Sequence, residues 1–349
     1  MITRAGSRLR MGAALAVVAM LAVACGGSGG GGAGGDGDGA GGDGAGRTVV
    51  RLGFSAWPGW FPWQVAEEKG LFDKAGVDVK LTYFESYTDS LNALNTGNLD
   101  ANSQTLGDTI SSVSGGAEQV VILVNDNSTG NDQIIVAPGI GRIEDLKGKR
   151  VGAEEGTVDH FLLLLGLDKA GLRQSDIDFK PLATDAAAAA FAAGQLDAVG
   201  VFAPFTTTAL ERPDSKALFT SAEFPGAIPD HLVFSRAFVE DNPGEVQKLV
   251  DVWFDTLAYI AAHKDEAVAI MARRAGVSVD DYAAYDRGTT VFTAEQNLQA
   301  FAPGDDMSHL DFAARRISTF LQEAGLVDKE PDLTGLLDAG FVEAHARRE

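Results

Sequence analysis

Cysteine is almost absent from this sequence, which contains one, Cys25, among its 349 residues. A chain with no second cysteine cannot form an internal disulfide or a cysteine-rich metal cluster. The five histidines lie far apart without the spacing of metal ligands, and no Gly-x-Ser-x-Gly nucleophile motif occurs. We therefore expect no metal site, no cofactor and no catalytic residue, and we predict that the protein is not an enzyme.

Basic residues are also scarce, with 28 lysines and arginines against 49 aspartates and glutamates and a formal net charge of −21. We expect no nucleic acid partner, because binding a phosphate backbone needs a basic surface. The hydrophobic share of 45% and the charged share of 22% are those of an ordinary globular protein. At this length about two domains are expected.

The apolar run over residues 11–23 is too short to span a membrane comfortably. Arginines precede it and small residues lead from it to Cys25, an arrangement typical of a secretion signal that is removed. The pattern resembles the lipobox of bacterial lipoproteins, in which the cysteine becomes the acylated first residue. We predict a signal peptide over residues 1–24 and a lipidated Cys25 that anchors an extracytoplasmic protein to the outer face of the cell membrane. The alternative is an ordinary secretion signal with a chance cysteine.

Residues 26–46 contain only Gly, Ser, Ala and Asp. Such a segment cannot bury apolar area, so we expect residues 25–46 to be a flexible tether that begins at the lipidated cysteine. The folded part is therefore expected from about residue 47 onward.

Two stretches of the folded part read alike. Residues 70–76 (GLFDKAG) are echoed by residues 166–171 (GLDKAG), and residues 97–101 (GNLDA) by residues 194–198 (GQLDA). Because both matches keep their order and nearly the same spacing, they indicate two lobes built on one plan.

Each copy predicts the order strand, helix, strand, helix, strand, which favours parallel sheets. The ranges are 48–54, 62–69, 77–84, 88–95 and 99–103, and then 150–153, 158–170, 177–182, 185–193 and 197–202. Beyond residue 242 the apolar spacing predicts helices, at 246–263, 265–275, 279–285, 294–301 and 310–324. We predict an α/β fold with two parallel-sheet lobes around a ligand cleft and a helical C-terminal part. Lobe 1 would comprise residues 47–131 and 231–349, and lobe 2 residues 132–230.

Three of the four tryptophans fall in the loop after the first predicted strand. Aromatic rings at such a place can pack on an apolar solute or hold a cation against their faces. We predict that Trp57 and Trp60 contact a ligand, whereas Trp63 anchors the following helix in the core.

Other polar and aromatic residues follow the remaining predicted strands, beyond whose carboxyl ends ligands bind in such sheets. The segments 126–132 and 229–231 are predicted to cross between the lobes. None of these loops contains lysine or arginine. The alternative is that they are solvated turns and helix caps. The further candidates for ligand contact are Glu85, Tyr87, Gln104, Thr105, Asn131, Glu155, Thr157, Phe202 and Asp230.

Four motifs carry a resemblance to a known family. Residues 66–72 (AEEKGLF), 97–101 (GNLDA), 143–152 (IEDLKGKRVG) and 194–198 (GQLDA) resemble the nitrate/taurine/sulfonate family of ABC-transporter substrate-binding proteins. The resemblance implies a two-lobed periplasmic-binding-protein fold of type II that closes on a small solute and delivers it to a membrane permease and its ATPase. It also implies that the loops at 55–60, 103–105, 155–157 and 202–204 line the cleft. A related branch resembles enzymes of thiamine-pyrimidine synthesis with a cysteine-rich motif, which this sequence lacks.

The function we predict is that of the extracytoplasmic solute-binding component of an ABC importer, acting as a monomer. Anion-binding members of the family often use basic residues, and these loops offer none. A taurine-like zwitterion, a cationic nitrogen compound and a neutral nitrogen compound therefore remain open as solutes. The alternatives are a small-molecule lyase or deaminase that uses Glu155 and His160 as acid and base, or a ligand sensor.

Overall fold

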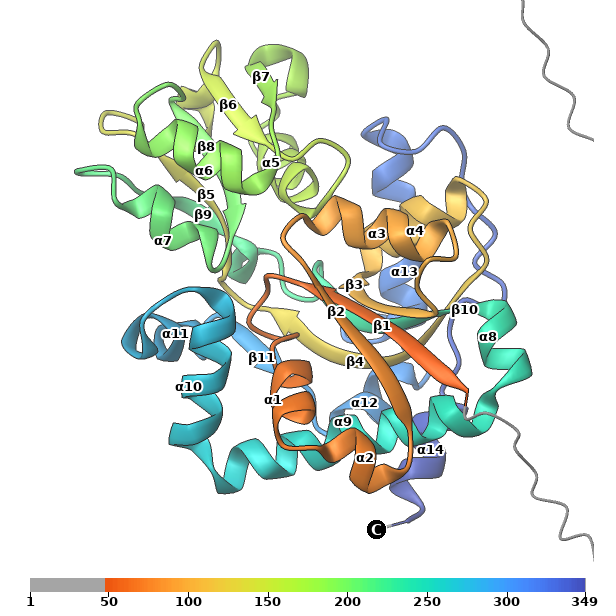
Figure 1. The fold of residues 1–349 in the computed structure, drawn as a ribbon. Helices are drawn as coiled ribbons and strands as arrows, with labels where there is room; N and C mark the ends of the chain where they lie inside the picture. Colours follow the sequence, from red (N-terminus) through yellow and green to blue (C-terminus); the bar gives the residue numbers. More distant parts are fainter. Residues whose placement is uncertain (1–47, 349) are drawn as a thin grey trace, which may run out of the picture. The chain divides into compact units, whose positions relative to one another are not determined.

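The computed structural model describes residues 48–348, which form two β-sheets with helices packed on them (Figure 1). The predicted signal peptide, the lipidated Cys25 and the tether lie outside the described residues. No helix among the described residues combines the length and the apolar character needed to cross a membrane. The α/β class with two lobes is confirmed.

The first lobe is built on a six-stranded sheet in the order β11-β4-β10-β3-β1-β2. Strand β1 pairs in parallel with β2 and β3, whereas β10 runs antiparallel between β3 and β4. All ten residues of β4 are buried, as befits a strand covered on both faces. The strands are β1 (Val49–Ser55), β2 (Asp78–Phe84), β3 (Ala101–Thr105), β4 (Gln119–Ser128), β10 (Pro229–Ser235) and β11 (Thr289–Val291).

The second lobe is built on a five-stranded sheet in the order β7-β6-β8-β5-β9. Strand β6 pairs in parallel with β7 and β8, and β5 runs antiparallel to β8 and β9. Each sheet is therefore mixed and not wholly parallel, because β5 and β10 begin where the chain has just crossed from the other sheet. The strands are β5 (Asp132–Val136), β6 (Arg150–Ala153), β7 (Asp178–Pro181), β8 (Ala198–Phe202) and β9 (Lys216–Thr220).

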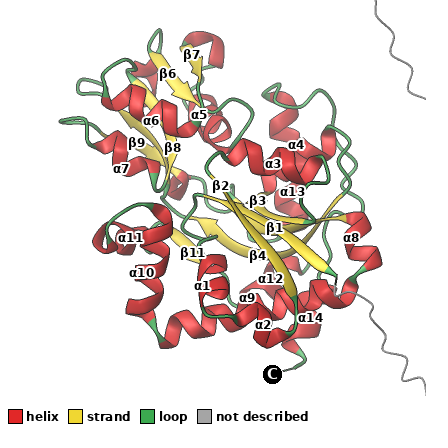
Figure 2. Ribbon diagram, viewed as in Figure 1, coloured by secondary structure: helices red, strands yellow, loops and turns green. Residues whose placement is uncertain are grey.

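Helices cover both faces of each sheet (Figure 2). In the first lobe, α3, α4 and α13 lie on one face and α1, α2, α9, α12 and α14 on the other (Figure 1). The predicted C-terminal helices are present and pack on this lobe. The helices of the first lobe are α1 (Pro62–Glu68), α2 (Leu71–Ala75), α3 (Tyr87–Asn95), α4 (Leu106–Ser114), α8 (Arg236–Asp241), α9 (Pro243–Ala262), α10 (Lys264–Ala275), α11 (Val279–Tyr285), α12 (Ala294–Phe301), α13 (Leu310–Glu323) and α14 (Gly340–Ala346).

In the second lobe, α5 lies on one face of the sheet and α6 and α7 on the other. The alternation along β5 explains how both faces are covered, because Ile134 belongs to the core on the α5 side and Ile135 to the core under α6. The helices are α5 (Val158–Lys169), α6 (Thr184–Ala192) and α7 (Phe205–Leu210).

The duplicated motif has the same structural role in both lobes. The Arg51 backbone N–H and Nε donate to the Asp100 carboxylate at 2.8 and 2.9 Å, and Arg150 donates to Asp197 in the same way at 3.0 and 3.1 Å. Each copy of the motif begins with a glycine, at residue 97 or residue 194. Both glycines adopt the left-handed backbone conformation that favours glycine, with φ 73° at Gly97. The repeat therefore encodes the junction at which a helix ends and the third strand begins beside the first.

A second repeated contact lies beside this junction. A Cβ atom on Gly53 of β1 would lie 2.3 Å from Leu99 Cδ1, and one on Gly152 of β6 would lie 2.5 Å from Leu196 Cδ1. In each lobe the leucine of the repeated motif thus packs directly on a strand glycine. The predicted duplication is confirmed at the level of individual contacts.

Candidate functional site

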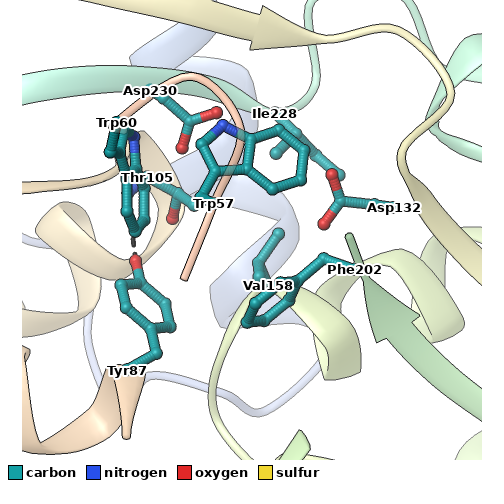
Figure 3. A pocket seen from close by; sticks show the side chains of 9 residues that line it. All are labelled: Trp57, Trp60, Tyr87, Thr105, Asp132, Val158, Phe202, Ile228 and Asp230. Carbon is teal, nitrogen blue, oxygen red and sulfur yellow. Dashed lines mark hydrogen bonds between the residues drawn. The ribbon is translucent and has the colours of Figure 1, made fainter. Parts of the chain in front are cut away.

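A small pocket lies where the two lobes meet (Figure 3). Its walls come from both lobes, since the loop after β1 and the start of α3 face the end of β8 and the start of α5. The cavity measures about 10 Å³, room for about one water molecule. The nine lining residues are Trp57, Trp60, Tyr87, Thr105, Asp132, Val158, Phe202, Ile228 and Asp230.

Aromatic rings form much of the pocket wall and join the lobes across it. Phe202 of the second lobe meets Trp57 and Tyr87 of the first edge-on, with ring centroids 6.2 and 6.3 Å apart. Trp60 packs on Tyr87 at 5.4 Å. Trp57 and Trp60 are each 3% exposed, so the lobes are closed over the pocket in this conformation.

The loop that carries Trp57 is fixed by a buried carboxylate. Trp57 Nε1 donates a hydrogen bond of 2.8 Å to Asp126 Oδ1 on β4. A Cβ atom on Gly59 would lie 1.9 Å from Asp126 Oδ2, so the loop can approach this carboxylate because residue 59 has no side chain. The ring of Trp57 is therefore held in place by the first lobe.

Tyr87 is fixed by a second buried carboxylate. Its hydroxyl donates to Asp108 Oδ2 at 2.7 Å and accepts from the Thr105 backbone N–H at 3.0 Å. Thr105 caps α4, and its hydroxyl lies 2.8 Å from the same Asp108 oxygen. Burial raises the pKa of Asp108 to about 6, although the hydrogen bonds from Tyr87 and Thr105 oppose the rise. Burial likewise raises the pKa of Tyr87, which stays protonated.

Two further carboxylates line the pocket itself, Asp132 at the start of β5 and Asp230 on β10 (Figure 3). Each is 1% exposed, and the Oδ2 atom of each has no hydrogen-bond partner. Burial raises the pKa of Asp132 to about 7, opposed by a hydrogen bond from Ser128. Burial, reinforced by the neighbouring Asp126 charge, raises the pKa of Asp230 well above its ordinary range. The nine lining residues include two acids and no base.

The structure brings together six of the eleven candidate ligand contacts. Thr157 lies beside the pocket. It lines a second small cavity that shares Thr105, Val158 and Ile228 with the pocket, and also an outer cleft of about 470 Å³ between α3, α4 and the turn at Glu155. Glu155 is exposed at the rim of that cleft. The six that line the pocket are Trp57, Trp60, Tyr87, Thr105, Phe202 and Asp230.

Three candidates lie away from the pocket. Gln104 points to the opposite face of β3 from Thr105, where its amide donates to Thr109 Oγ1 at 2.9 Å, because neighbouring strand residues alternate between faces. The Asn131 amide donates to the Tyr285 carbonyl at 2.8 Å, which ties the crossing segment to α11. Glu85 is exposed at the end of β2 and is not among the lining residues.

Three lining residues were not among the candidates: Asp132, Val158 and Ile228. Asp132 lay within a segment predicted to cross between lobes, but the sequence does not say which of its acids faces the pocket. Val158 opens α5 beside the predicted Thr157. The prediction that Trp63 belongs to the core is confirmed, since it is fully buried, packs on Trp253 at 4.7 Å and donates to Ser103.

No group of three or more His, Cys, Asp or Glu among residues 48–348 is arranged to hold a metal ion.

Comparison with known proteins gives consistent matches. The model of the NMT1-like family matches residues 43–276. A putative binding protein of Brucella abortus (strain 2308) is 31% identical over 230 residues, which cover 64% of this chain and 70% of the relative. The taurine-binding periplasmic protein of Escherichia coli (strain K12) is 26% identical over 279 residues, 76% of this chain and 84% of the relative.

Solved structures match the fold over most of its length. The periplasmic aliphatic sulphonate binding protein SsuA from Escherichia coli superposes with a TM-score of 0.68 at 24% identity, covering 82% of this chain and 96% of that structure. The desulfurization enzyme DSZB superposes with a TM-score of 0.62 at 18% identity, covering 86% of this chain and 99% of that structure. The fold is therefore that of periplasmic binding proteins, and an enzyme shares it.

Proposed function

This chain belongs to the NMT1-like family, and from that premise we propose that it is the extracytoplasmic solute-binding component of an ABC importer. Its ligand would be a small nitrogen- or sulfur-containing organic solute. One observation carries the proposal: a closed pocket whose walls come from both lobes. A site divided in this way forms when the lobes approach and is lost when they separate, as a receptor that captures and releases a solute requires.

The contacts between the lobes support a closing motion. Tyr285 of α11 and Thr207 of α7 join their hydroxyls at 2.7 Å, and Thr88 of α3 donates to Glu154 of the second lobe. The chain passes between the sheets between β4 and β5 and again between β9 and β10. We propose these two crossings as the hinge. The first keeps the division of the chain near residue 131, and the second moves it to before β10, which begins at Pro229, so that Asp230 belongs to the first lobe. The cavity holds about one water molecule, so the lobes have to open before a solute enters.

The two residues considered for an acid–base enzyme, Glu155 and His160, have other surroundings in this structure. His160 Nδ1 accepts from the Gly156 N–H at 3.2 Å, and Nε2 lies 2.8 Å from Gln174 Oε1, so both ring nitrogens are engaged. Burial lowers the pKa of His160, and Glu155 lies exposed at the rim of the outer cleft. An acid and base pair that needs both residues at one substrate bond therefore has no support.

Membrane attachment and partners complete the proposal. A lipid on Cys25 and a glycine-rich tether would hold a monomeric receptor at the outer face of the membrane, within reach of a permease and its ATPase. The binding-protein relatives support the extracytoplasmic setting. A sensor that hands its ligand to another protein would use the same pocket, and genes for a permease and an ATPase beside this one would favour transport.

The test combines ligand recovery with solution scattering. The purified protein is incubated with a small-molecule extract of bacterial cells, and the bound compound is released by denaturation and identified by mass spectrometry. We expect a compound that returns chemically unchanged after prolonged incubation and that lowers the radius of gyration at saturation. Conversion of the compound, or a scattering profile that does not change at saturation, would contradict the receptor function.

A further inference from the structure

We propose that the solute is a small organic cation whose charged head carries N–H groups and sits between Asp132 and Asp230 against the aromatic wall. The inference rests on the proposed function and names the class of solute that the same pocket takes.

The two pocket carboxylates come from opposite lobes and lack partners on the pocket side. Asp132 begins a strand of the second sheet, and Asp230 lies on β10 of the first. Figure 3 shows their carboxylates on different sides of the Trp57 ring. Both Oδ2 atoms are buried without a hydrogen-bond donor. A buried carboxylate oxygen left in this state is costly, and an N–H group of a bound cation would satisfy it.

The surroundings of the pocket strengthen the preference for positive charge. Asp126 lies opposite Asp230 on the neighbouring strand, and the charges of Asp126, Asp132 and Asp108 all raise the pKa of Asp230. Asp132 also acts on Asp159 of α5 in the same sense. Carboxylate charges close together in a buried space repel one another. A cation bound among them is attracted by each of them, and this attraction offsets their mutual repulsion.

The pocket does not suit a sulfonate head, because an anion needs free hydrogen-bond donors or positive charge around it. The hydrogen-bond donors on the lining side chains are largely engaged, since Trp57 Nε1 donates to Asp126 and the Tyr87 hydroxyl to Asp108. Trp60 Nε1 has no partner and remains as a donor. One free indole N–H, in a pocket that also holds two carboxyl groups, does not balance a sulfonate charge. The sulfonate named for several relatives is therefore not the group we expect in this pocket.

The aromatic rings of the pocket wall also favour a cationic head. Ring faces attract cations, most strongly those of tryptophan, and Trp57 and Trp60 both line the cavity. The cavity holds about one water molecule in this closed conformation, so only a small head fits between the two carboxylates.

The test uses defined probes and isothermal titration calorimetry on the full purified protein. The cations with N–H groups are methylguanidinium and ethylammonium chloride, and the comparison probes are tetramethylammonium chloride, sodium propanesulfonate, taurine and calcium chloride. We expect the N–H cations to bind, tetramethylammonium to bind about tenfold more weakly, and propanesulfonate to give no heat beyond dilution. Binding of propanesulfonate or calcium in place of the N–H cations would overturn the inference, as would no binding by either N–H cation at millimolar concentration.

Substitutions at Asp132 and Asp230 test whether these two carboxylates bind the cation. Asp132→Asn and Asp230→Asn keep the shape of the side chain and remove its charge, and each should weaken binding of the N–H cations about tenfold or more. Asp255→Asn on the exposed face of α9 is the matched control and should bind as the unaltered protein does. If either pocket variant does not fold, the other carries the test. Affinity that stays unchanged in a folded pocket variant would overturn the inference.

The two proposals fail in different ways. If the compound recovered from the extract compacts the protein but is an anion, the receptor function stands and the cation inference is wrong. If N–H cations bind but the radius of gyration does not change, the cation inference stands and the receptor function is wrong.

Discussion

Replacing Asp132 by asparagine should make the ligand-free protein more stable at pH 8. The Asp132 carboxyl has a pKa of about 7 in the folded protein, because burial disfavours its charge, and an ordinary value of 3.8. The folded state therefore holds a proton between these values that the unfolded chain has lost, so stability falls as the pH rises through this window. The full difference corresponds to about 4 kcal/mol above pH 7.

Asparagine has no ionisable group, so Asp132→Asn removes the loss of stability that comes from the raised pKa. The substitution also weakens the hydrogen bond from Ser128, and this weakening lowers the stability by about 1 kcal/mol. We therefore expect Asp132→Asn to raise the free energy of unfolding by about 3 kcal/mol at pH 8 and to have little effect, or a slightly unfavourable one, at pH 4. The nearby acids Asp126, Asp159 and Asp230 titrate in both proteins, and the Asp132 charge raises the pKa of each of them. Removing that charge therefore also eases their ionisation, which adds to the stabilisation at pH 8.

The measurement is urea denaturation of both proteins at pH 4, 6 and 8 without ligand, with Asp255→Asn as the exposed control. A free-energy difference that is the same at all three pH values would refute the reasoning. Such a result would mean that folding does not change the pKa of Asp132, and the buried carboxylate would need a partner that the structure does not show.

Three further predictions concern binding and attachment. An N–H cation should bind more weakly at pH 5 than at pH 8, because protons on Asp132 (pKa about 7) and Asp108 (pKa about 6) compete with it; calorimetry in buffers of different ionisation enthalpy should report proton release, and its absence would contradict the linkage. Trp57→Ala should weaken solute binding by about 1 to 3 kcal/mol if the ring is an anchor, and unaltered affinity by calorimetry would count against the aromatic wall. Cys25→Ser should move the protein from the membrane fraction to the soluble fraction, and continued membrane retention would contradict lipid anchoring.

Local pattern predicted the strands and most helices of the two copies and the C-terminal helices, but no strand was predicted for β4, β5, β9, β10 or β11. The strand predicted at residues 150–153 is β6, with the same bounds, and the helix predicted at 158–170 is α5. Helix α4 was missed because five of the nine residues in LGDTISSVS are Asp, Thr or Ser and one is glycine, and all of these are poorer helix formers than alanine or leucine. It is stabilised by the Thr105 cap and by packing against α13. Long-range packing of this kind is not visible in a local pattern.

Part of the site could be predicted from the sequence. The tryptophan loop is unusual in composition and comes directly after the first strand, and ligands bind beyond the carboxyl ends of such strands. The choice between Gln104 and Thr105 depended on the strand's register, and only one of them faces the pocket. The choice of Asp132 among the acids of the crossing segment depended on how the chain enters the second sheet. Sequence reasoning therefore found the loops but not every side chain that faces inward.

A double-mutant cycle at Gly152 and Leu196 measures the stability that the repeated glycine–leucine contact contributes, without changing a residue that lines the pocket. A methyl on Gly152 would meet Leu196 Cδ1 at 2.5 Å, and neither residue lines the pocket. Overpacking at Gly152→Ala should cost about 1 to 3 kcal/mol, and the cavity left by Leu196→Ala about 2 to 5 kcal/mol.

The double variant should lose clearly less than the sum of the two, because the shortened side chain makes room for the new methyl, which fills part of the cavity. Urea denaturation measures the three free energies, and calorimetry with the same solute should give an unchanged affinity for each folded variant. Additive losses would mean that this glycine and leucine do not act as a packed pair. A change in affinity would mean that the repeated glycine–leucine contact also shapes the pocket.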